Sequence, residues 1–528
     1  MSRDFHLPGR SPVIAREGMV ATSHPLAAMA AIDTLRAGGN AADAAVTAVA
    51  LLGVVEPGMT GIGGDCFCLV AKPGESPWGY NGSGRAGAAM RVEDLIAQGI
   101  RRIEQNSVHA VTVPGAVEAW ETILARHGRF GLDRALQPAI RASEDGFPVA
   151  PRVGYDWALF ADKLRADPGA AKHYLPGGAV PKVGDVVLLP AHAQTLRAIA
   201  KSGSRAFYEG EPAADIVATL AARGGVLTED DFAAHRGEEV TPISSNYRGL
   251  DVVEIPPNGQ GLAALVLLNI LERFEMARLD PLGADRFHIA LEAGRLAYAV
   301  RDTHVADPNF MRMSVPALLD RAFAGKLADL IDREKRADLP KAPTPNGDTV
   351  LLTVVDRDRM AVSIINSLYF GFGGGIATEK TGVLLHNRGW GFVVEPADHP
   401  NAIGPNKRPM HSIIPALGMR EGRCEYAFGV MGGSYQAMGH AHVVSNMIDY
   451  GMDVQEALDA PRVFFEDEKT VIERAVSAQA VEGLKARGHD VMVRPLPLGG
   501  GQIIKIDWER GVLIGGSDPR KDGCALGY

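Results

Sequence analysis

An Asp-Thr pair, Asp348 and Thr349, stands where a turn-forming segment meets an apolar strand pattern. The sequence over 344–356 reads TPNGDTVLLTVVD, and its alternating apolar run begins at Val350. If the bond between Asp348 and Thr349 is cut, Thr349 becomes a new N-terminus. The α-amino group has an unperturbed pKa of roughly 7.7–8.0, so its neutral fraction can take the proton of the threonine hydroxyl. If the bond stays intact, the same residues form only a turn followed by a strand.

A second feature that suits this chemistry is the Gly432-Gly433 pair in FGVMGGSYQAMGHAHVV. The pair follows a strand pattern and precedes a helical one, and glycine lets backbone N–H groups approach a ligand without a Cβ in the way. The N-terminus of the following helix adds positive potential where an oxyanion would form. Gly-Gly turns between a strand and a helix are also common without a catalytic role. The catalytic interpretation of this pair therefore requires a nucleophile nearby.

The elements that would position these residues follow from apolar periodicity and from cap and turn residues. Helices are predicted at 24–37, 40–54, 261–277, 284–302, 315–337 and 436–450, with a largely helical region over 115–235. Strands are predicted at 65–71, 250–255, 350–356, 360–368, 424–430, 491–496, 501–507 and 511–518. The proline-rich stretch ADLPKAPTPNGD (337–348) is predicted to be an exposed, irregular linker.

Composition limits the class of protein. The chain has 528 residues, which predicts two or more domains or one large layered unit. Its net charge of −9 argues against nucleic acid and against an anionic membrane as partners. No uninterrupted apolar stretch reaches the about 18–20 residues that span a bilayer, and the N-terminus lacks a signal-peptide pattern, so a cytoplasmic location is expected. The four cysteines suggest neither a disulfide framework nor a C-x-x-C site.

Segments spread over nearly the whole chain resemble the γ-glutamyltransferase superfamily, whose members are N-terminal-nucleophile (Ntn) hydrolases made as proenzymes. TVLLTVVD matches the strand that begins with the catalytic threonine of this family, and RPMHSIIP (408–415) matches a segment lining its substrate site. The other matching segments are AGGNAADAAV, EPGMTGIGGD, VPGAVEAW, TPISSNYRG, PPNGQG, AYAVRDTHVADPNF and GGSDPR. Because these segments occur in the same order along the chain as in the family, together they are much stronger evidence than any one of them.

The resemblance implies a four-layer αββα fold of the α/β (α+β) class and self-cleavage between Asp348 and Thr349. Residues 1–348 would form a helix-rich large subunit and residues 349–528 a small subunit, together one αββα unit. The subunits are expected to stay together as a heterodimer, and a dimer of heterodimers is the larger assembly to consider. Neither a cofactor nor a metal ion is expected.

The mechanism that the resemblance implies is acyl transfer from a small-molecule amide. Thr349 Oγ attacks the amide carbonyl, the N–H groups of Gly432 and Gly433 hold the oxyanion, and an acyl-enzyme forms. Water, or an amine in a transferase, then releases the acyl group. Ser367 falls where the family has a second threonine that hydrogen-bonds the nucleophile, and a serine hydroxyl can do the same.

The sequence departs from the family where the family binds the glutamyl group. The arginine of the family's R-E-x-A-P segment corresponds to Ser83 in NGSGRAGAA, and Arg85 is two residues away. Arg85 would therefore either reach the substrate from a shifted position or be an ordinary surface charge.

On the side of the pocket that binds the amine, the replacements are larger. The family's asparagine corresponds to Tyr369, its acidic pair to Trp390 and Gly391, and its two serines to His411 and Ser412. No carboxylate remains there to pair with an ammonium group, so a γ-glutamyl zwitterion should bind poorly.

The replacing residues are aromatic and basic, and they predict an acyl group with an anionic or aromatic end and no free amine. The predicted substrate-binding residues are Arg85, Tyr369, Trp390, His411 and Ser412, with Arg388 as a further basic group. Oxamate amidohydrolase and the cephalosporin acylases are superfamily members with substrates of this kind. The favoured prediction is therefore a small-amide hydrolase of that type.

Two alternatives stay open. The chain could be a γ-glutamyl hydrolase with a rearranged pocket, or a family member that is never processed and serves as a binding protein. A metal site on the helix that carries His440 and His442 is not favoured, because residues at i and i+2 do not face the same way.

Overall fold

Two of the predicted strands form a hairpin at the centre of a large antiparallel sheet. β10 (Asp348–Val355) and β11 (Ala361–Tyr369) pair with each other, and all nine residues of β11 are buried. Strands buried on both faces must be covered on both sides. The computed structural model describes residues 9–338 and 348–528, so the predicted linker at 337–348 lies almost entirely outside the described residues.

This hairpin belongs to one of two seven-stranded sheets, which we call the Thr349 sheet and the β13 sheet. In spatial order, the Thr349 sheet contains β19 (Cys524–Gly527), β2 (Met19–Thr22), β10, β11, β3 (Asp65–Ala71), β4 (Trp78–Gly82) and β7 (Glu238–Val240). The β13 sheet contains β1 (Val13–Ala15), β18 (Val512–Ser517), β17 (Gly500–Asp507), β13 (Arg423–Met431), β12 (Ala416–Arg420), β9 (Leu250–Glu254) and β8 (Ile243–Tyr247). Small sheets are formed by β14 (Val463–Glu466), β15 (Lys469–Ile472) and β16 (Asp490–Val493), and by β5 (Phe147–Pro148) and β6 (Val186–Val187).

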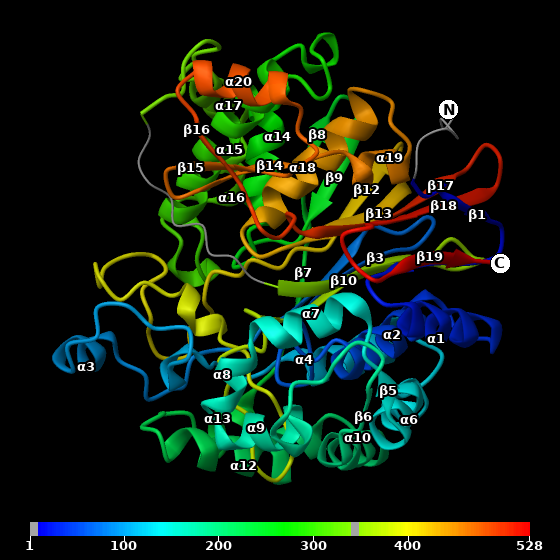
Figure 1. The fold of residues 1–528 in the computed structure, drawn as a ribbon, viewed down its shortest axis with the longest axis vertical. Helices are drawn as coiled ribbons and strands as arrows, with labels where there is room; N and C mark the ends of the chain where they lie inside the picture. The colour runs from blue at the N-terminus through cyan, green and yellow to red at the C-terminus, as the bar shows by residue number, and fades with distance from the viewer. Residues whose placement is uncertain (1–8, 339–347) are drawn as a thin grey trace.

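The two large sheets stack on each other, and helices cover their outer faces (Figure 1). β10 packs on β13 and β17 of the opposite sheet. The outer face of the Thr349 sheet is covered by α1 (Pro25–Arg36), α2 (Ala41–Val55) and α4 (Ala116–His127), and that of the β13 sheet by α14 (Gly261–Leu271) and α18 (Tyr435–Ile448). α15 (Ala284–His304) packs on α14. The predicted four-layer αββα architecture is therefore confirmed.

The remaining helices lie around this frame. They are α3 (Val92–Ala97), α5 (Leu132–Ala135), α6 (Gln137–Asp145), α7 (Pro151–Leu159), α8 (Ala161–Arg165), α9 (Pro168–Tyr174), α10 (Pro190–Ser202), α11 (Arg205–Tyr208), α12 (Glu211–Ala221), α13 (Glu229–Ala234), α16 (Val315–Leu318), α17 (Arg321–Ala328), α19 (Val454–Asp459) and α20 (Ala478–Ala486). None of the helices in the described part of the chain is long and apolar enough to cross a membrane.

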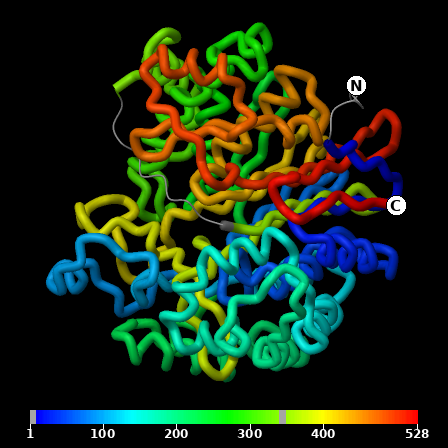
Figure 2. The backbone as a smooth tube through the Cα atoms, in the orientation of Figure 1, coloured from blue at the N-terminus to red at the C-terminus, as the bar shows by residue number. Residues whose placement is uncertain are grey.

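Segments from the two ends of the chain interleave in the sheets. Figure 2 shows the late part of the chain, coloured yellow to red, running between blue and green segments. In the Thr349 sheet, β10 lies between β11 and the early strand β2, and β2 also pairs with the last strand, β19. A chain cut before Thr349 would therefore stay associated through ladder hydrogen bonds and through the buried faces of both sheets.

Two helix predictions are wrong at their C-terminal ends. The pattern predicted a helix over 315–337, but α17 ends at Ala328. The backbone that follows bonds elsewhere: the Asp332 carbonyl accepts from His288, and the Ala337 N–H donates to Glu292. These tertiary hydrogen bonds replace the helical ones that local propensity favours. α14 likewise ends at Leu271 rather than near residue 277.

Candidate active site

Thr349 lies near the start of β10, opposite a β-bulge in β11. The register slips between Asp348 and Val350, so Ser367 and Leu368 both lie opposite Thr349. A bulge re-aims side chains locally. Here Thr349 Oγ1 lies 3.1 Å from Ser367 Oγ, and Thr349 is only 1% exposed. The structure therefore brings together the two hydroxyls that the sequence pairs.

The chain turns sharply just after Ser367. The backbone N–H of Tyr369 donates to Ser367 Oγ over 2.8 Å, which fixes the serine side chain relative to Thr349. Tyr369 has φ +81°, a conformation that costs a non-glycine residue about 1–3 kcal/mol. Strain of this kind persists where the surrounding structure imposes it, and it concentrates at functional sites.

The Gly432-Gly433 turn connects the end of β13 to α18, and both glycines have positive φ, +125° and +59°. A Cβ at Gly432 would lie 2.8 Å from the Cα of Gly499, so only glycine fits there without a backbone shift. Within the described residues, neither glycine N–H donates a hydrogen bond. Two such donors at the start of a helix are suited to hold an oxyanion.

Gln260, the residue just before α14, supports this turn. Its Nε2 donates to the carbonyl oxygens of Gly433 at 3.0 Å and Ser412 at 2.6 Å, and its Oε1 accepts from Arg301 Nη1 at 2.8 Å. The side chain is fully buried. Gln260 thus ties the glycine turn to the 408–415 segment. Sequence reasoning included Gln260 in the PPNGQG segment but gave it no role, because its partners lie far away in the chain.

His411 is buried and fully hydrogen-bonded. Its Nε2–H donates to Asp65 Oδ2 over 3.0 Å, and its Nδ1 accepts the backbone N–H of Ile413. Burial, and then the positive charge of Arg388, lower the pKa of His411 to about 3, so the ring stays neutral. With both ring nitrogens engaged, His411 holds the 408–415 segment in place. The structure does not present it as a direct substrate ligand.

Tyr369 and Trp390 line a cavity of about 450 Å³. Trp390 lies on a 3₁₀ turn (Arg388–Gly391), and the two rings meet edge to face with centroids 5.9 Å apart. Arginines cover both rings: the guanidinium of Arg388 lies 3.7 Å from the centre of the Tyr369 ring, and that of Arg102 lies 4.9 Å from the Trp390 ring. Cation–π contacts of this kind leave the edges of a guanidinium available for hydrogen bonds.

The charged groups that line this cavity leave it positive. Two carboxylates line it, and each has an arginine partner: Asp302 bonds Arg301 at 2.7 Å, and Glu395 bonds Arg101 at 3.1 Å. Arg102 is a third arginine in the lining. The cavity is therefore better suited to an anionic group than to an ammonium group.

Arg85 does not lie with these residues. Its guanidinium bonds Glu238 at 2.6 Å and Asp307 at 3.1 Å, and the residue lines a different cavity. Ser83, at the position of the family's arginine, is buried and donates to the Asn81 side chain. Of the two interpretations of Arg85, the structure favours a charge held by local partners. The arginine that the structure brings to the Tyr369 side of the site is Arg388.

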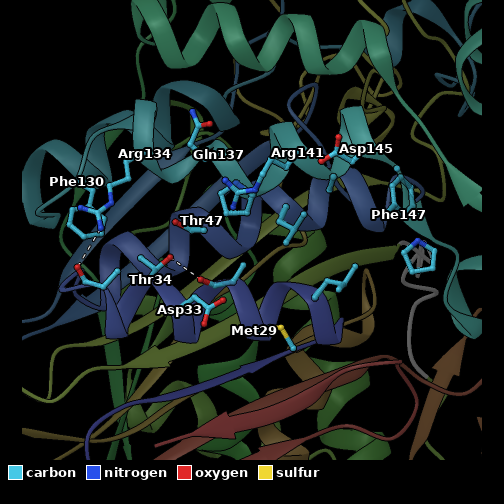
Figure 3. A pocket seen from close by; sticks show the side chains of 18 residues that line it. Met29, Asp33, Thr34, Thr47, Phe130, Arg134, Gln137, Arg141, Asp145 and Phe147 are labelled. Carbon is cyan, nitrogen blue, oxygen red and sulfur yellow. Dashed lines mark hydrogen bonds between the residues drawn. The ribbon is translucent and has the colours of Figure 1, made fainter.

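Another cavity, of about 640 Å³, lies between α1 and the α5–α6 region. Figure 3 shows Arg134, Gln137 and Arg141 facing Asp33 and Thr34 across it. None of the predicted catalytic or substrate-binding residues lines this cavity. It is therefore separate from the candidate active site.

Three buried residues of types that can bind a metal ion lie together on α15 and just before β16. The sequence alone did not reveal this cluster. His288, Glu292 and His489 place their donor atoms within 4.8 Å of one another. His489 Nε2–H donates to His288 Nδ1 at 2.8 Å, and His288 Nε2–H donates to the Asp332 carbonyl at 2.7 Å, in the tautomers that satisfy every ring nitrogen. Glu292 bonds Arg295 at 2.8 Å. The hydrogen bonds are complete without a metal ion.

His440, one of the two histidines that the sequence places on α18, has a partner of its own. Its Nδ1 lies 2.7 Å from Glu254 Oε1, and both side chains are fully buried. This contact joins α18 to β9 and so supports the layer that carries the Gly432-Gly433 turn.

A four-layer αββα frame with a buried hydroxyl pair on one sheet and a glycine turn on the other defines an amide hydrolase of the Ntn class. Comparison with known proteins gives the family. The gamma-glutamyltranspeptidase family profile matches residues 27–528, and the chain belongs to this family.

Relatives with several different names match the chain almost end to end. The chain is 37% identical to a glutathione hydrolase-like YwrD proenzyme of Bacillus subtilis, with 98% of this chain and 99% of that protein covered. It is 34% identical to an oxamate amidohydrolase proenzyme of Klebsiella pneumoniae, with the same shares covered. Its structure matches that of a cephalosporin acylase from Bacillus halodurans with a TM-score of 0.93 and 40% identity, covering 100% and 99% of the two chains.

Proposed function

We propose that the chain cleaves itself between Asp348 and Thr349 and then hydrolyses a small amide whose acyl group carries no free amine. Residues 1–348 and 349–528 are the two proposed subunits. In the first step, Thr349 Oγ1 attacks the Asp348 carbonyl carbon, the bond to the Thr349 nitrogen breaks, and water hydrolyses the resulting ester. That sequence leaves Thr349 with a free α-amino group, the base that its hydroxyl needs. The proenzyme names of the relatives support this maturation.

The mature chemistry follows from the same groups. The Thr349 amine takes the hydroxyl proton as Oγ1 attacks the substrate carbonyl, and the N–H groups of Gly432 and Gly433 receive the oxyanion. The amine then gives its proton to the leaving nitrogen, and the acyl-enzyme remains. Water, deprotonated by the same amine, releases the acid. Ser367 holds Thr349 Oγ1 in place, 3.1 Å away.

The observation that carries the choice of acyl group is the positive charge of the Tyr369–Trp390 cavity. Both carboxylates in its lining are paired with arginines, and Arg102 adds further positive charge. A γ-glutamyl ammonium group would lose its hydration there without a matching anion. An acyl group that ends in a carboxylate would instead be attracted by the positive charge of the cavity.

A second candidate function is γ-glutamyl hydrolysis, which is favoured by an unpaired carboxylate oxygen at the cavity. Asp302 Oδ2 is buried and has no hydrogen-bond partner within the described residues. It lies at the cavity, where an ammonium group could use it. The chain is also 33% identical to a glutathione hydrolase proenzyme of Escherichia coli.

Two measurements test the proposal. Intact-mass spectrometry should find two fragments in the wild type, with one starting at Thr349, and a single chain in Thr349→Ala. Thr353→Val is the matched control, because Thr353 is a fully buried threonine on the same strand whose hydroxyl has no partner among the described residues. It should be cleaved normally. An uncleaved wild type would contradict the proposal and favour an unprocessed binding protein.

The second measurement separates the two acyl groups. Glutaryl-p-nitroanilide and γ-glutamyl-p-nitroanilide differ only in the α-amino group. The proposal expects a higher kcat/KM for the glutaryl compound. A clear preference for the γ-glutamyl compound would establish the second candidate instead.

A further inference from the structure

The cavity of about 640 Å³ between α1 and the α5–α6 region has a buried floor between two helices. α1 and α6 both pack on α2, and Thr47 and Leu51 of α2 form the floor between them. These two residues are 2% and 4% exposed, so the cavity reaches down to a helix whose residues are all buried. Its volume lies within the about 300–1,000 Å³ that is usual for small-molecule sites.

Much of the lining is apolar. Besides Leu51, it includes Leu26, Met29, Phe130 and Phe147. Met29 is 56% exposed although it is apolar, and it lies at the edge of the same cavity. A ligand with an apolar body would remove this surface from water, and that burial is favourable by about 25 cal/mol per Å².

The charged groups of the cavity walls are not used by the protein. Within the described residues, the Arg141 guanidinium has no hydrogen-bond or ion-pair partner, and neither has the carboxylate of Asp33. Arg141 and Asp145 lie at i and i+4 on α6, the spacing at which Arg152 and Asp156 of α7 form an ion pair at 2.8 Å, yet Arg141 and Asp145 do not pair. Figure 3 shows Arg141 and Asp33 on opposite sides of the cavity.

A ligand that uses both walls must carry both charges. A carboxylate suits Arg141, because a guanidinium can bind it through two parallel hydrogen bonds. An ammonium group suits Asp33, and apolar groups between the two charges would cover Met29 and Leu51. A simple anion or a simple amine would leave one wall unused. The termini and side chains of a short apolar peptide supply all three parts.

We propose that this cavity binds a short peptide with free termini and apolar side chains, its carboxylate on Arg141 and its ammonium group on Asp33. The proposal goes beyond the proposed function, because the active-site cavity disfavours a free amine whereas this one offers it a carboxylate. Since α2 packs on β10 and β11, a bound peptide would also stabilise the helix layer over the strand that carries Thr349. All lining residues lie in 26–148, so binding does not depend on cleavage.

The test uses three peptides and isothermal titration calorimetry. Leucylleucine has both charges, N-acetyl-leucylleucine lacks the ammonium group, and leucylleucinamide lacks the carboxylate. Leucylleucine should bind the wild type with a Kd of ~1 mM or tighter, and each blocked peptide should bind ~10-fold more weakly. Asp33→Asn should weaken leucylleucine ~10-fold and leave the N-acetyl peptide within ~2-fold of its wild-type Kd. Arg141→Gln should do the same with the amide as the insensitive peptide.

Arg278→Gln is the matched control, because Arg278 is an exposed arginine that does not line the cavity. It should bind all three peptides as the wild type does. Equal affinity for the three peptides in the wild type would overturn the proposal, as would no binding at ~10 mM leucylleucine. An unchanged Kd for leucylleucine in both Asp33→Asn and Arg141→Gln would place the peptide elsewhere and also overturn it. These outcomes are independent of whether Thr349 becomes an N-terminus.

Discussion

Two buried clusters of this protein contain residue types that do chemistry, and they differ in how their hydrogen bonds are completed. In the histidine cluster, Thr470, His489, His288 and the Asp332 carbonyl form one continuous chain of hydrogen bonds. At the Thr349 site, the N–H groups of the glycine turn and Arg388 Nη2 have no acceptor within the described residues.

The two clusters also differ in their backbone conformation. The Thr349 site is surrounded by residues with positive φ, namely Tyr369, Gly432 and Gly433. The histidine cluster lies on helix α15 and at a loop, where His288 and His489 have ordinary conformations. Residue type alone therefore does not identify a functional site. A better mark of a ligand site is a group of hydrogen-bond donors that lack acceptors and are held by strained or glycine backbone, because a ligand can supply the missing acceptors.

The largest expected effect comes from the backbone of the glycine turn. Gly432→Ala should lower kcat/KM at least ~10³-fold, because the new Cβ meets Gly499 and a positive φ disfavours alanine, so the oxyanion donor must move. Steady-state kinetics measures the loss, and intact-mass spectrometry shows whether cleavage fails as well. Gly374→Ala is the control, since the nearest atom to its Cβ is 3.6 Å away. A Gly432→Ala enzyme within tenfold of the wild type would contradict the oxyanion role.

An intermediate effect is expected from the side chain that supports the turn. Gln260→Met removes the donor to the Gly433 and Ser412 carbonyls, so kcat should fall ~10–100-fold while KM changes little. The control is Gln455→Met, which removes a buried glutamine of α19 that bonds Asp459 on the same helix and Ser517 on β18. Both variants should lose thermal stability, and only Gln260→Met should lose turnover. Equal turnover in the two would make Gln260 a purely structural residue.

The smallest effect on catalysis is expected from the histidine cluster. Burial lowers the pKa of His489 to about 3, whereas an unfolded histidine has a pKa of about 6.5. Below pH 6.5 the unfolded chain therefore binds a proton that the folded chain does not, and stability falls as the pH drops from about 6.5 toward 3. Thermal unfolding of His489→Gln should show a lower Tm at pH 7 and a flatter decline of Tm below pH 6.5 than the wild type, with kcat/KM within twofold.

One result would remove the contrast between the clusters. If added zinc raised the Tm of the wild type and not that of His489→Gln, the histidine cluster would be a metal site, and complete hydrogen bonding would not distinguish it from the Thr349 site. The comparison predicts no zinc-dependent shift.

Much of the frame could be predicted from local sequence. Asn40 caps α2 and forms a capping box with Asp43, as the helix start at residue 40 predicted. The strand patterns around Thr349 and Gly432 also occur as β10 and β13. These signals act over a few residues, so they can be recognised without tertiary structure. The end of α17 could not be predicted, because the backbone beyond it forms long-range hydrogen bonds with His288 and Glu292.

The substrate side of the site was less accessible to sequence reasoning. His411 and Arg85 were predicted to bind substrate, yet their polar groups are used by Asp65 in one case and by Glu238 and Asp307 in the other. Arg388 was noted only as a basic group. A side chain's type is local, but whether its donors are used depends on residues hundreds of positions away.

The sequence by itself determined the family resemblance, the layered architecture and the candidate nucleophile, since these rest on ordered motifs and local periodicity. Only the tertiary structure decided that Ser367 faces Thr349, that Gln260 supports the glycine turn, and that Arg388 rather than Arg85 lies at the site. The physical reason is that hydrogen-bond and ion-pair completion is a property of the folded neighbourhood: the same arginine is a satisfied surface group or a binding group according to the partners that the fold brings to it.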